Sequence, residues 1–204
     1  MSIYKELSSK PWEYRAPTEG TALESAFDLA PEKVALRLFM VVAGVIFSLV
    51  GVTYYVRLDL GDWVPLSDPG LLWWNTGLLV VGSVCLQISR NAAFADNRAK
   101  ARSMFILSGL FSAAFVTGQW FVWQQLTAAG LGVNTNPASA FFFLLTGLHL
   151  VHVLGGLWVW SKTAFRLLGK ADLATVKLSI ELCTSYWHFL LVLWVLLFAA
   201  LANT

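Results

Sequence analysis

The chain has 204 residues, of which 57% are hydrophobic and only 13% are charged, and ten of its residues are tryptophan. Soluble globular domains carry about 25% charged residues, so this composition excludes an ordinary soluble domain and indicates a membrane protein with several spans. The formal net charge of +2 comes with no basic stripe, so no nucleic-acid partner is expected.

The first 32 residues are polar and contain both acidic and basic side chains. They have no apolar core followed by a cleavage site, which a signal peptide would show. We therefore expect residues 1–32 to form a polar cytoplasmic tail and residues 33–204 to form a transmembrane domain.

Five apolar segments follow this tail, and each is long enough to cross about 30 Å of hydrocarbon at about 1.5 Å per helical residue. The expected spans are approximately 34–56, 71–89, 103–123, 139–161 and 178–201. Two glycines of the third span, Gly109 and Gly118, would allow a neighbouring helix to approach closely. The pattern predicts an all-α membrane protein, built as a bundle of five transmembrane helices.

The charges of the loops predict the orientation of the bundle. The first loop is acidic and the third is uncharged, whereas the second and fourth carry basic residues. These are Arg90, Arg98, Lys100 and Arg102 in the second loop, and Lys162, Arg166, Lys170 and Lys177 in the fourth. Because loops rich in Lys and Arg remain on the cytoplasmic side, we expect the N-terminus inside and the C-terminus outside.

Four polar side chains of the fifth span fall on one face of its helix. They are Glu181, Thr184, Ser185 and His188. Their spacing of i, i+3, i+4 and i+7 puts them on one side, while Leu, Val and Phe cover the others. An ionisable group inside a bilayer is costly unless it faces protein, so this face is expected to pack on another helix.

The fourth span contains the other polar side chains expected at membrane depth, Thr146, His149 and His152. Its two histidines are three residues apart, so they lie about 60° from each other around the helix. We expect this helix to be the partner of the polar face on the fifth span. The seven side chains would then form a structural network between the two helices.

A metal site is the alternative to that network. The three histidines and Glu181 offer imidazole and carboxylate ligands for iron, copper or zinc, as in a stand-alone intramembrane metalloenzyme. The histidines fall at similar depth, but Glu181 lies about 10 Å nearer the cytoplasm at the helical rise. This separation favours the network, with no catalytic, cofactor-binding or metal-binding residue in the chain.

The polar residues of the fourth and fifth spans belong to two longer motifs. The first is the run 142–156, which reads FFLLTGLHLVHVLGG, and the second is Glu181 followed after five residues by Trp-His-Phe at 187–189. These motifs resemble subunit III of the haem-copper oxidases, the cytochrome c oxidase subunit III family. Supporting matches are Asn75-Thr76, Gly118-Gln119 and Leu36-x-Leu38-Phe39. The resemblance covers about residues 36–198. It is to the short five-helix form, which lacks the first two helices of the seven-helix version.

The sequence departs from this family at two places. The family carries a glutamate in the middle of the helix that matches the first span, but residues 41–45 here read VVAGV. An aspartate that follows the Trp-His-Phe triplet in the family is replaced by Leu190 and Leu191. A role of the glutamate in collecting protons is therefore not carried over to this chain.

The resemblance implies a cofactor-free accessory subunit of a respiratory terminal oxidase that serves aerobic electron transport and catalyses nothing by itself. Three histidines are too few to hold the redox centres, so haem and copper are expected in the catalytic subunit I. The expected partners are subunit I, other oxidase subunits and membrane phospholipids, which are candidate bound ligands.

The expected role is to stabilise the catalytic subunit together with its lipid and proton-entry environment. The expected location is the plasma membrane of a bacterium or an equivalent energy-transducing membrane. Two alternatives are kept: an accessory subunit of a quinol oxidase or nitric oxide reductase, and the stand-alone metalloenzyme described above.

Overall fold

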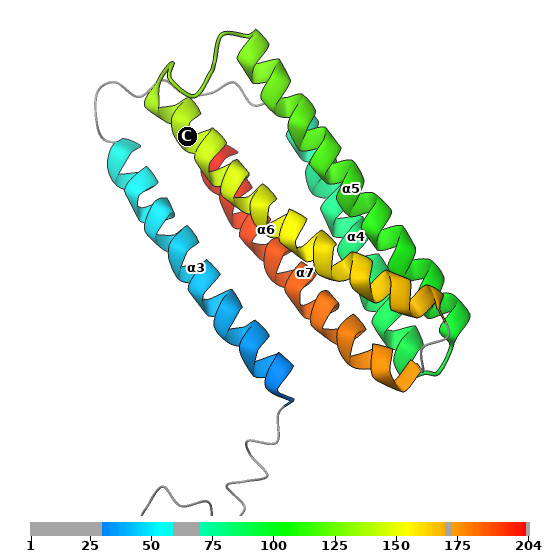
Figure 1. Ribbon diagram of the computed structural model, residues 1–204. Helices are drawn as coiled ribbons and strands as arrows, with labels where there is room; N and C mark the ends of the chain where they lie inside the picture. The colour runs from blue at the N-terminus through cyan, green and yellow to red at the C-terminus, as the bar shows by residue number, and fades with distance from the viewer. Residues whose placement is uncertain (1–29, 59–69, 170–172, 203–204) are drawn as a thin grey trace, which may run out of the picture. The chain divides into compact units, whose positions relative to one another are not determined.

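The computed structural model describes residues 30–58, 70–169 and 173–202. In this part of the chain all regular structure is α-helical, and Figure 1 shows the helices as long ribbons. The helices are α3 Pro31–Leu58, α4 Leu71–Phe94, α5 Arg98–Ala128, α6 Pro137–Leu168 and α7 Leu173–Ala202. The expected tail and the expected acidic first loop lie outside the described residues, apart from their last few positions.

Each of these helices is long and apolar enough to cross a membrane. All five expected spans lie within them. The prediction of five helices long and apolar enough to cross a membrane is therefore confirmed, and the described residues contain no strand.

The helices are longer than the expected spans, because a helix can continue past the hydrocarbon into the headgroup region. α4 ends at Phe94 and α5 begins at Arg98, so the second loop comprises only residues 95–97. The side chain of Asn97 accepts a hydrogen bond of 3.1 Å from the backbone N–H of Lys100 and caps α5. The basic residues expected in this loop therefore stand on the last turns of α4 and the first turns of α5.

The core lies among α4, α5, α6 and α7. α4 packs against α5 and α7, and α6 also packs against α5 and α7. Each helix contributes large buried side chains to one apolar cluster, among them Leu86, Phe105, Phe142 and Trp194. Close packing between the side chains of these four helices therefore holds this part of the chain together.

Two glycines on α5 set how closely its neighbours approach. A Cβ atom at Gly109 would overlap the indole of Trp160 on α6, and a Cβ atom at Gly118 would overlap the side-chain amide of Asn75 on α4. The role predicted for these glycines is confirmed, because a side chain from the next helix occupies the space beside each of them.

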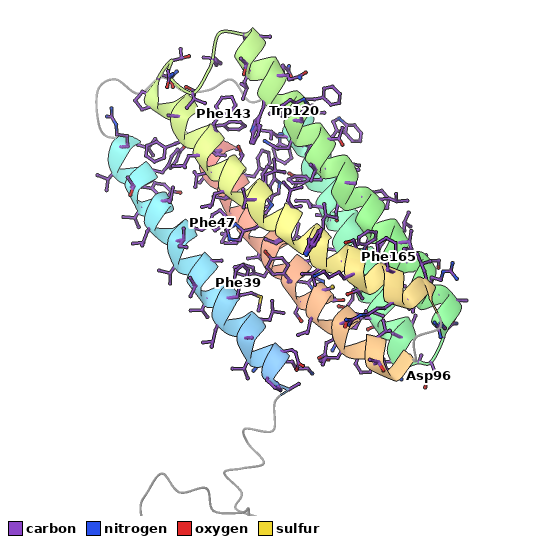
Figure 2. All side chains as sticks on the ribbon, in the orientation of Figure 1. Phe39, Phe47, Asp96, Trp120, Phe143 and Phe165 are labelled. Carbon is purple, nitrogen blue, oxygen red and sulfur yellow. The ribbon has the colours of Figure 1, made fainter. Side chains whose placement is uncertain are left out.

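α3 is the least buried of the helices. Only 11% of its span is buried, against 33–39% for the spans of α4 to α7. Aromatic residues make many of its contacts with the core, and Figure 2 shows Phe39 and Phe47 extending from α3 toward α6. Tyr54 lies further along the helix and meets Phe141 of α6, with ring centroids 5.6 Å apart. Aliphatic residues of α3, among them Leu36 and Met40, also pack against the core. Large apolar side chains of α3, such as Leu38, Val41 and Leu49, are exposed on its other faces.

Candidate functional site

His149 lies in the middle of the bundle and is completely buried. Aromatic rings from three other helices surround its imidazole. The ring centroids lie 6.5 Å from Phe47 of α3, 5.9 Å from Phe115 of α5 and 5.1 Å from Trp194 of α7. Neither ring nitrogen of His149 has a hydrogen-bond partner among the described residues. This histidine is therefore enclosed by aromatic rings and is not joined to a polar side chain of α7.

His152, one turn further along α6, is half-buried and faces α3. Its Nδ1 lies 2.7 Å from the backbone oxygen of Leu148, one turn earlier in the same helix. Its ring also packs against Phe39 and Phe47, with centroids 6.0 and 5.4 Å away. The link between His152 and α7 runs through its backbone oxygen, which accepts a hydrogen bond of 3.1 Å from the Tyr186 hydroxyl.

Thr146 completes the polar set on α6 and is bonded toward α5. Its hydroxyl donates to the backbone oxygen of Phe142 at 2.6 Å and accepts from the indole Nε1 of Trp123 at 3.1 Å. The three expected residues of α6 are thus close together along the helix, but their polar atoms point to different surroundings.

Two polar residues of α7, Glu181 and Thr184, contact α4, which differs from the expected packing on α6. An oxygen of Glu181 lies 3.7 Å from a guanidinium nitrogen of Arg90 on α4. The hydroxyl of Thr184 donates to the backbone oxygen of Ile180 at 2.8 Å, and it lies 3.5 Å from the backbone oxygen of Leu86 on α4. These contacts of Glu181 and Thr184 are with α4 and within α7, whereas the sequence predicted partners on α6.

Ser185 and His188 complete the expected polar face. Ser185 is exposed and His188 is half-buried, so the core does not enclose the whole face. Within the described residues, no group of three or more His, Cys, Asp or Glu side chains is arranged to hold a metal ion. The structure therefore does not gather the histidines and Glu181 into the ligand set that the metalloenzyme alternative requires.

Indole N–H groups make the interhelical polar contacts that the sequence did not reveal. Trp187 of α7 donates to the hydroxyl of Ser112 on α5 at 2.8 Å, and Trp194 donates to the hydroxyl of Thr76 on α4 at 2.9 Å. Trp160 of α6 donates to a backbone oxygen of α5 at 3.1 Å. A tryptophan inside a span needs an acceptor for its N–H. Its presence in the sequence was therefore the signal that could have indicated these hydrogen bonds.

An apolar groove lies between α3, α6 and α7. Its volume is about 530 Å³, and Phe39, Gly156, Tyr186 and Trp187 are among the residues that line it. At Gly156 the two rings of α7 pack closely on α6, because a Cβ atom there would lie 2.9 Å from the ring of Tyr186 and 3.1 Å from that of Trp187. The volume is within the range of ligand sites, and the apolar walls at membrane depth suit a hydrocarbon chain.

One end of the bundle joins the two basic loops. A guanidinium nitrogen of Arg98 donates to the backbone oxygen of Gly169 at 2.6 Å. The ammonium group of Lys177 donates to Asp96 at 2.7 Å, and Figure 2 labels Asp96 at this end of the helices. The second and fourth loops therefore lie at the same end of the bundle, as the alternation of spans requires.

The comparisons with known proteins agree on one family. The family model described as cytochrome c oxidase subunit III matches residues 35–202. A probable cytochrome c oxidase subunit 3 of Nocardia farcinica is 29% identical over 126 residues, which are 62% of each chain. A cytochrome c oxidase subunit 3 of Corynebacterium diphtheriae is 31% identical over 124 residues, which are 60% of each chain.

A third relative comes from a quinol-oxidising enzyme. It is the cytochrome bo(3) ubiquinol oxidase subunit 3 of Pseudomonas putida, 26% identical over 125 residues, which are 61% of this chain and 60% of that one. The chain thus spans about three fifths of the length of these three relatives. The family model covers nearly all of the described helices, and the predicted resemblance is confirmed: the chain belongs to the cytochrome c oxidase subunit III family.

Proposed function

We propose that this chain is a non-catalytic accessory subunit of a respiratory haem-copper oxidase, a cytochrome c oxidase, which supports aerobic electron transport. The observation that carries this proposal is the match of the subunit III family model to residues 35–202, a region that holds the whole helical core. The catalytic subunit I and the other oxidase subunits would be its partners, and haem and copper would reside in those partners.

The surroundings of the three histidines support a structural role. His149 is enclosed by aromatic rings, and His152 bonds to a backbone oxygen of its own helix. His188 lies two helical turns from Glu181 on the same face of α7, and Glu181 is the residue that contacts Arg90 of α4. Side chains that lie apart and contact rings or backbone oxygens contribute to packing between helices. This arrangement supports the proposal that a well-packed bundle stabilises the catalytic subunit.

The groove between α3, α6 and α7 supports a part for lipid in this function. Phospholipid would place an acyl chain against Phe39, Tyr186 and Trp187, where the walls are apolar and the depth is that of the bilayer. Lipid held at this place would fill the space beside the sparsely packed α3 and keep the proton-entry surface of the catalytic subunit intact during turnover.

The orientation and the location belong to the same proposal. The two basic loops lie at one end of the bundle, and the positive-inside rule assigns that end to the cytoplasm. The N-terminus would then be inside and the C-terminus outside, in the plasma membrane of a bacterium or an equivalent energy-transducing membrane.

Purification of the complex through an affinity tag on this chain tests the proposed function. The expected result is that a haem-containing subunit co-purifies in stoichiometric amount, as seen in the optical spectrum and by mass analysis. Purification of the chain alone with stoichiometric bound metal would instead support the stand-alone metalloenzyme.

A quinol oxidase accessory subunit is the second candidate, and the relative from Pseudomonas putida is the observation that favours it. The same purified complex separates the two candidates. Oxidation of reduced cytochrome c supports the first candidate, and oxidation of a quinol without oxidation of cytochrome c supports the second.

A further inference from the structure

Three polar side chains in the core have buried atoms without partners. They are Asn75 on α4, Gln119 on α5 and His149 on α6, with exposed fractions of 1%, 0% and 0%. Among the described residues, Nδ2 of Asn75, both amide atoms of Gln119 and both ring nitrogens of His149 lack a hydrogen-bond partner. Native proteins leave few such atoms unpaired, so a group of five needs a physical explanation.

Two contacts between α5 and α6 place Gln119 and His149 at one level of the bundle. The rings of Phe115 and His149 are 5.9 Å apart, and the indole Nε1 of Trp123 is 3.1 Å from the hydroxyl of Thr146. Gln119 lies one helical turn from Phe115 and one from Trp123, on the same face of α5. It therefore points to the stretch of α6 between Thr146 and His149.

The third side chain, Asn75, reaches this level from α4. Its amide fills the space beside Gly118, where a Cβ atom would overlap it. Gly118 immediately precedes Gln119 in the chain, so the amides of Asn75 and Gln119 belong to the same layer of the bundle. Three helices thus bring unpaired polar groups to one buried layer.

The neighbouring polar groups are already engaged and do not satisfy these atoms. Thr76 donates to the backbone oxygen of Leu72 at 2.8 Å and accepts from Trp194 at 2.9 Å. Thr146 likewise donates to a backbone oxygen and accepts from Trp123. Each hydroxyl has used its one donor, and none of the unpaired atoms makes a hydrogen bond to either of them, so their partner is a different group.

The chemistry of the unpaired atoms selects the ligand. The amide nitrogens of Asn75 and Gln119 are donors and need an acceptor, whereas the amide oxygen of Gln119 is an acceptor and needs a donor. Neutral His149 offers one donor and one acceptor. A cation cannot accept from the amide nitrogens, and an anion cannot donate to the amide oxygen. Water does both, and a buried water usually makes about three hydrogen bonds.

We propose that this layer is a buried hydration site, in which at least one water molecule bridges Asn75, Gln119 and His149. The side chains are closed off from the surface of this chain, so neither a lipid nor a partner subunit can reach them. Bridging water would connect α4, α5 and α6 at one level, and it would give the unpaired atoms of this layer their hydrogen-bond partners. The inference does not depend on which reaction the complex catalyses.

The direct test is a density map of the purified complex at a resolution that shows ordered water. The expected result is a water peak within hydrogen-bond distance of Gln119 and of Asn75 or His149. A map in which the two amides bond to each other or to His149, with no water between them, would overturn the proposal.

A pair of matched variants gives a second test, in which the two explanations predict opposite signs. If water bridges the layer, Gln119→Met removes its partner and lowers the temperature at which the chain is lost from the complex. If the Gln119 amide is truly unpaired, the apolar replacement raises that temperature. Gln125→Met is the control, because it makes the same change at an exposed position of the same helix.

Shared water also predicts coupling between residues. The double variant Gln119→Met with His149→Phe should lose less thermal stability than the sum of the two single variants, because each single change already disturbs the same water. Strictly additive losses, or a gain in stability from Gln119→Met, would show that the two side chains do not share a ligand.

Discussion

The buried tryptophans of this bundle make hydrogen bonds as well as apolar contacts. The indole of Trp187 fills space beside Gly156 and also donates to the hydroxyl of Ser112 on α5. The N–H group needs an acceptor because hydrocarbon offers none, so the hydrogen bond fixes how α7 is rotated against α5. The same pairing of an indole with a small hydroxyl residue joins Trp194 to Thr76.

Replacing Trp187 by phenylalanine tests this hydrogen bond. Trp187→Phe retains a ring but leaves Ser112 without its donor, and the expected loss is about 0.5–1.5 kcal/mol. The measurement is the temperature at which the chain dissociates from the purified complex. Trp74→Phe serves as the control, since that indole is 76% exposed. Equal effects of the two changes would show that the Ser112 contact contributes nothing.

Glu181 offers a second test at the level of a single residue. Because it lies 3.7 Å from Arg90, Glu181→Leu removes the counter-charge of a partly exposed guanidinium, and we expect weaker assembly. Glu181→Gln keeps a hydrogen-bond acceptor and should have a mild effect. The pair is partly exposed, so a cost below about 1 kcal/mol is expected.

The amount of this chain recovered per haem in the purified complex measures that effect. The double variant Glu181→Leu with Arg90→Leu should recover part of the loss, since it leaves no unpaired charge. An equal loss in the single and double variants would mean that Glu181 acts through a partner other than Arg90.

At the scale of whole helices, α5 and α3 differ in how closely they pack on the core. α5 approaches α4 and α6 so closely that glycine is needed at two of its positions, whereas α3 adds an aromatic stripe to the outside. Between close helices the dispersion contacts are dense, so a small change of volume has a large effect. On the exposed faces of α3 a similar change meets no other side chain of the described core.

A single methyl group should separate these two situations. Gly109→Ala puts a Cβ atom into the Trp160 indole, and overpacking of this kind costs about 1–3 kcal/mol. Gly77→Ala is the matched control on α4, because a Cβ atom there meets nothing within 4 Å. Thermal dissociation of the complex compares the two. A stability of Gly109→Ala no lower than that of Gly77→Ala would mean that the Trp160 indole moves aside at no cost.

At the scale of the whole molecule, the ends of the bundle determine how the chain meets its surroundings. The end that holds Asp96, Lys177 and Arg98 is rich in charge and is joined by interhelical bonds. The opposite end includes the α5–α6 loop, which contains no charged residue between Thr127 and Pro137. This asymmetry is the physical basis for assigning the first end to the cytoplasm.

Cysteine labelling in intact cells checks that assignment. Asn134→Cys in the α5–α6 loop should react with an impermeant thiol reagent from outside, whereas Lys100→Cys near the α4–α5 turn should be protected. The natural cysteines Cys85 and Cys183 are both buried, so they leave a low background. Protection at position 134 together with labelling at position 100 would reverse the topology.

Removal of the whole chain tests whether the complex needs it for oxygen reduction or only for lasting activity. The partner subunits are proposed to hold all the redox centres, and the first helix has no carboxylate in its middle that could relay a proton. Oxygen reduction should therefore be measurable at first and decline faster with turnover, as packing and lipid are lost. Immediate and complete loss of activity, in a complex that retains its haem and copper, would contradict this role.

The sequence by itself determined the features that depend on composition and local pattern. Hydropathy and segment length predicted all five helices, because a stretch that crosses hydrocarbon must satisfy its backbone internally and be apolar along about twenty residues. The motifs around His149 and His188 indicated the family that the comparisons confirm. The glycines of the third span were recognised because close helix approach requires a residue without a side chain.

Only the tertiary structure decided which helix each polar face meets. Helical periodicity shows that Glu181 and Thr184 share a face, but it does not contain the rotation and register that turn this face to α4 instead of α6. The acceptors of the buried indoles and the common layer of Asn75, Gln119 and His149 have the same origin. They arise from contacts between residues far apart in the chain, and these depend on how whole helices pack.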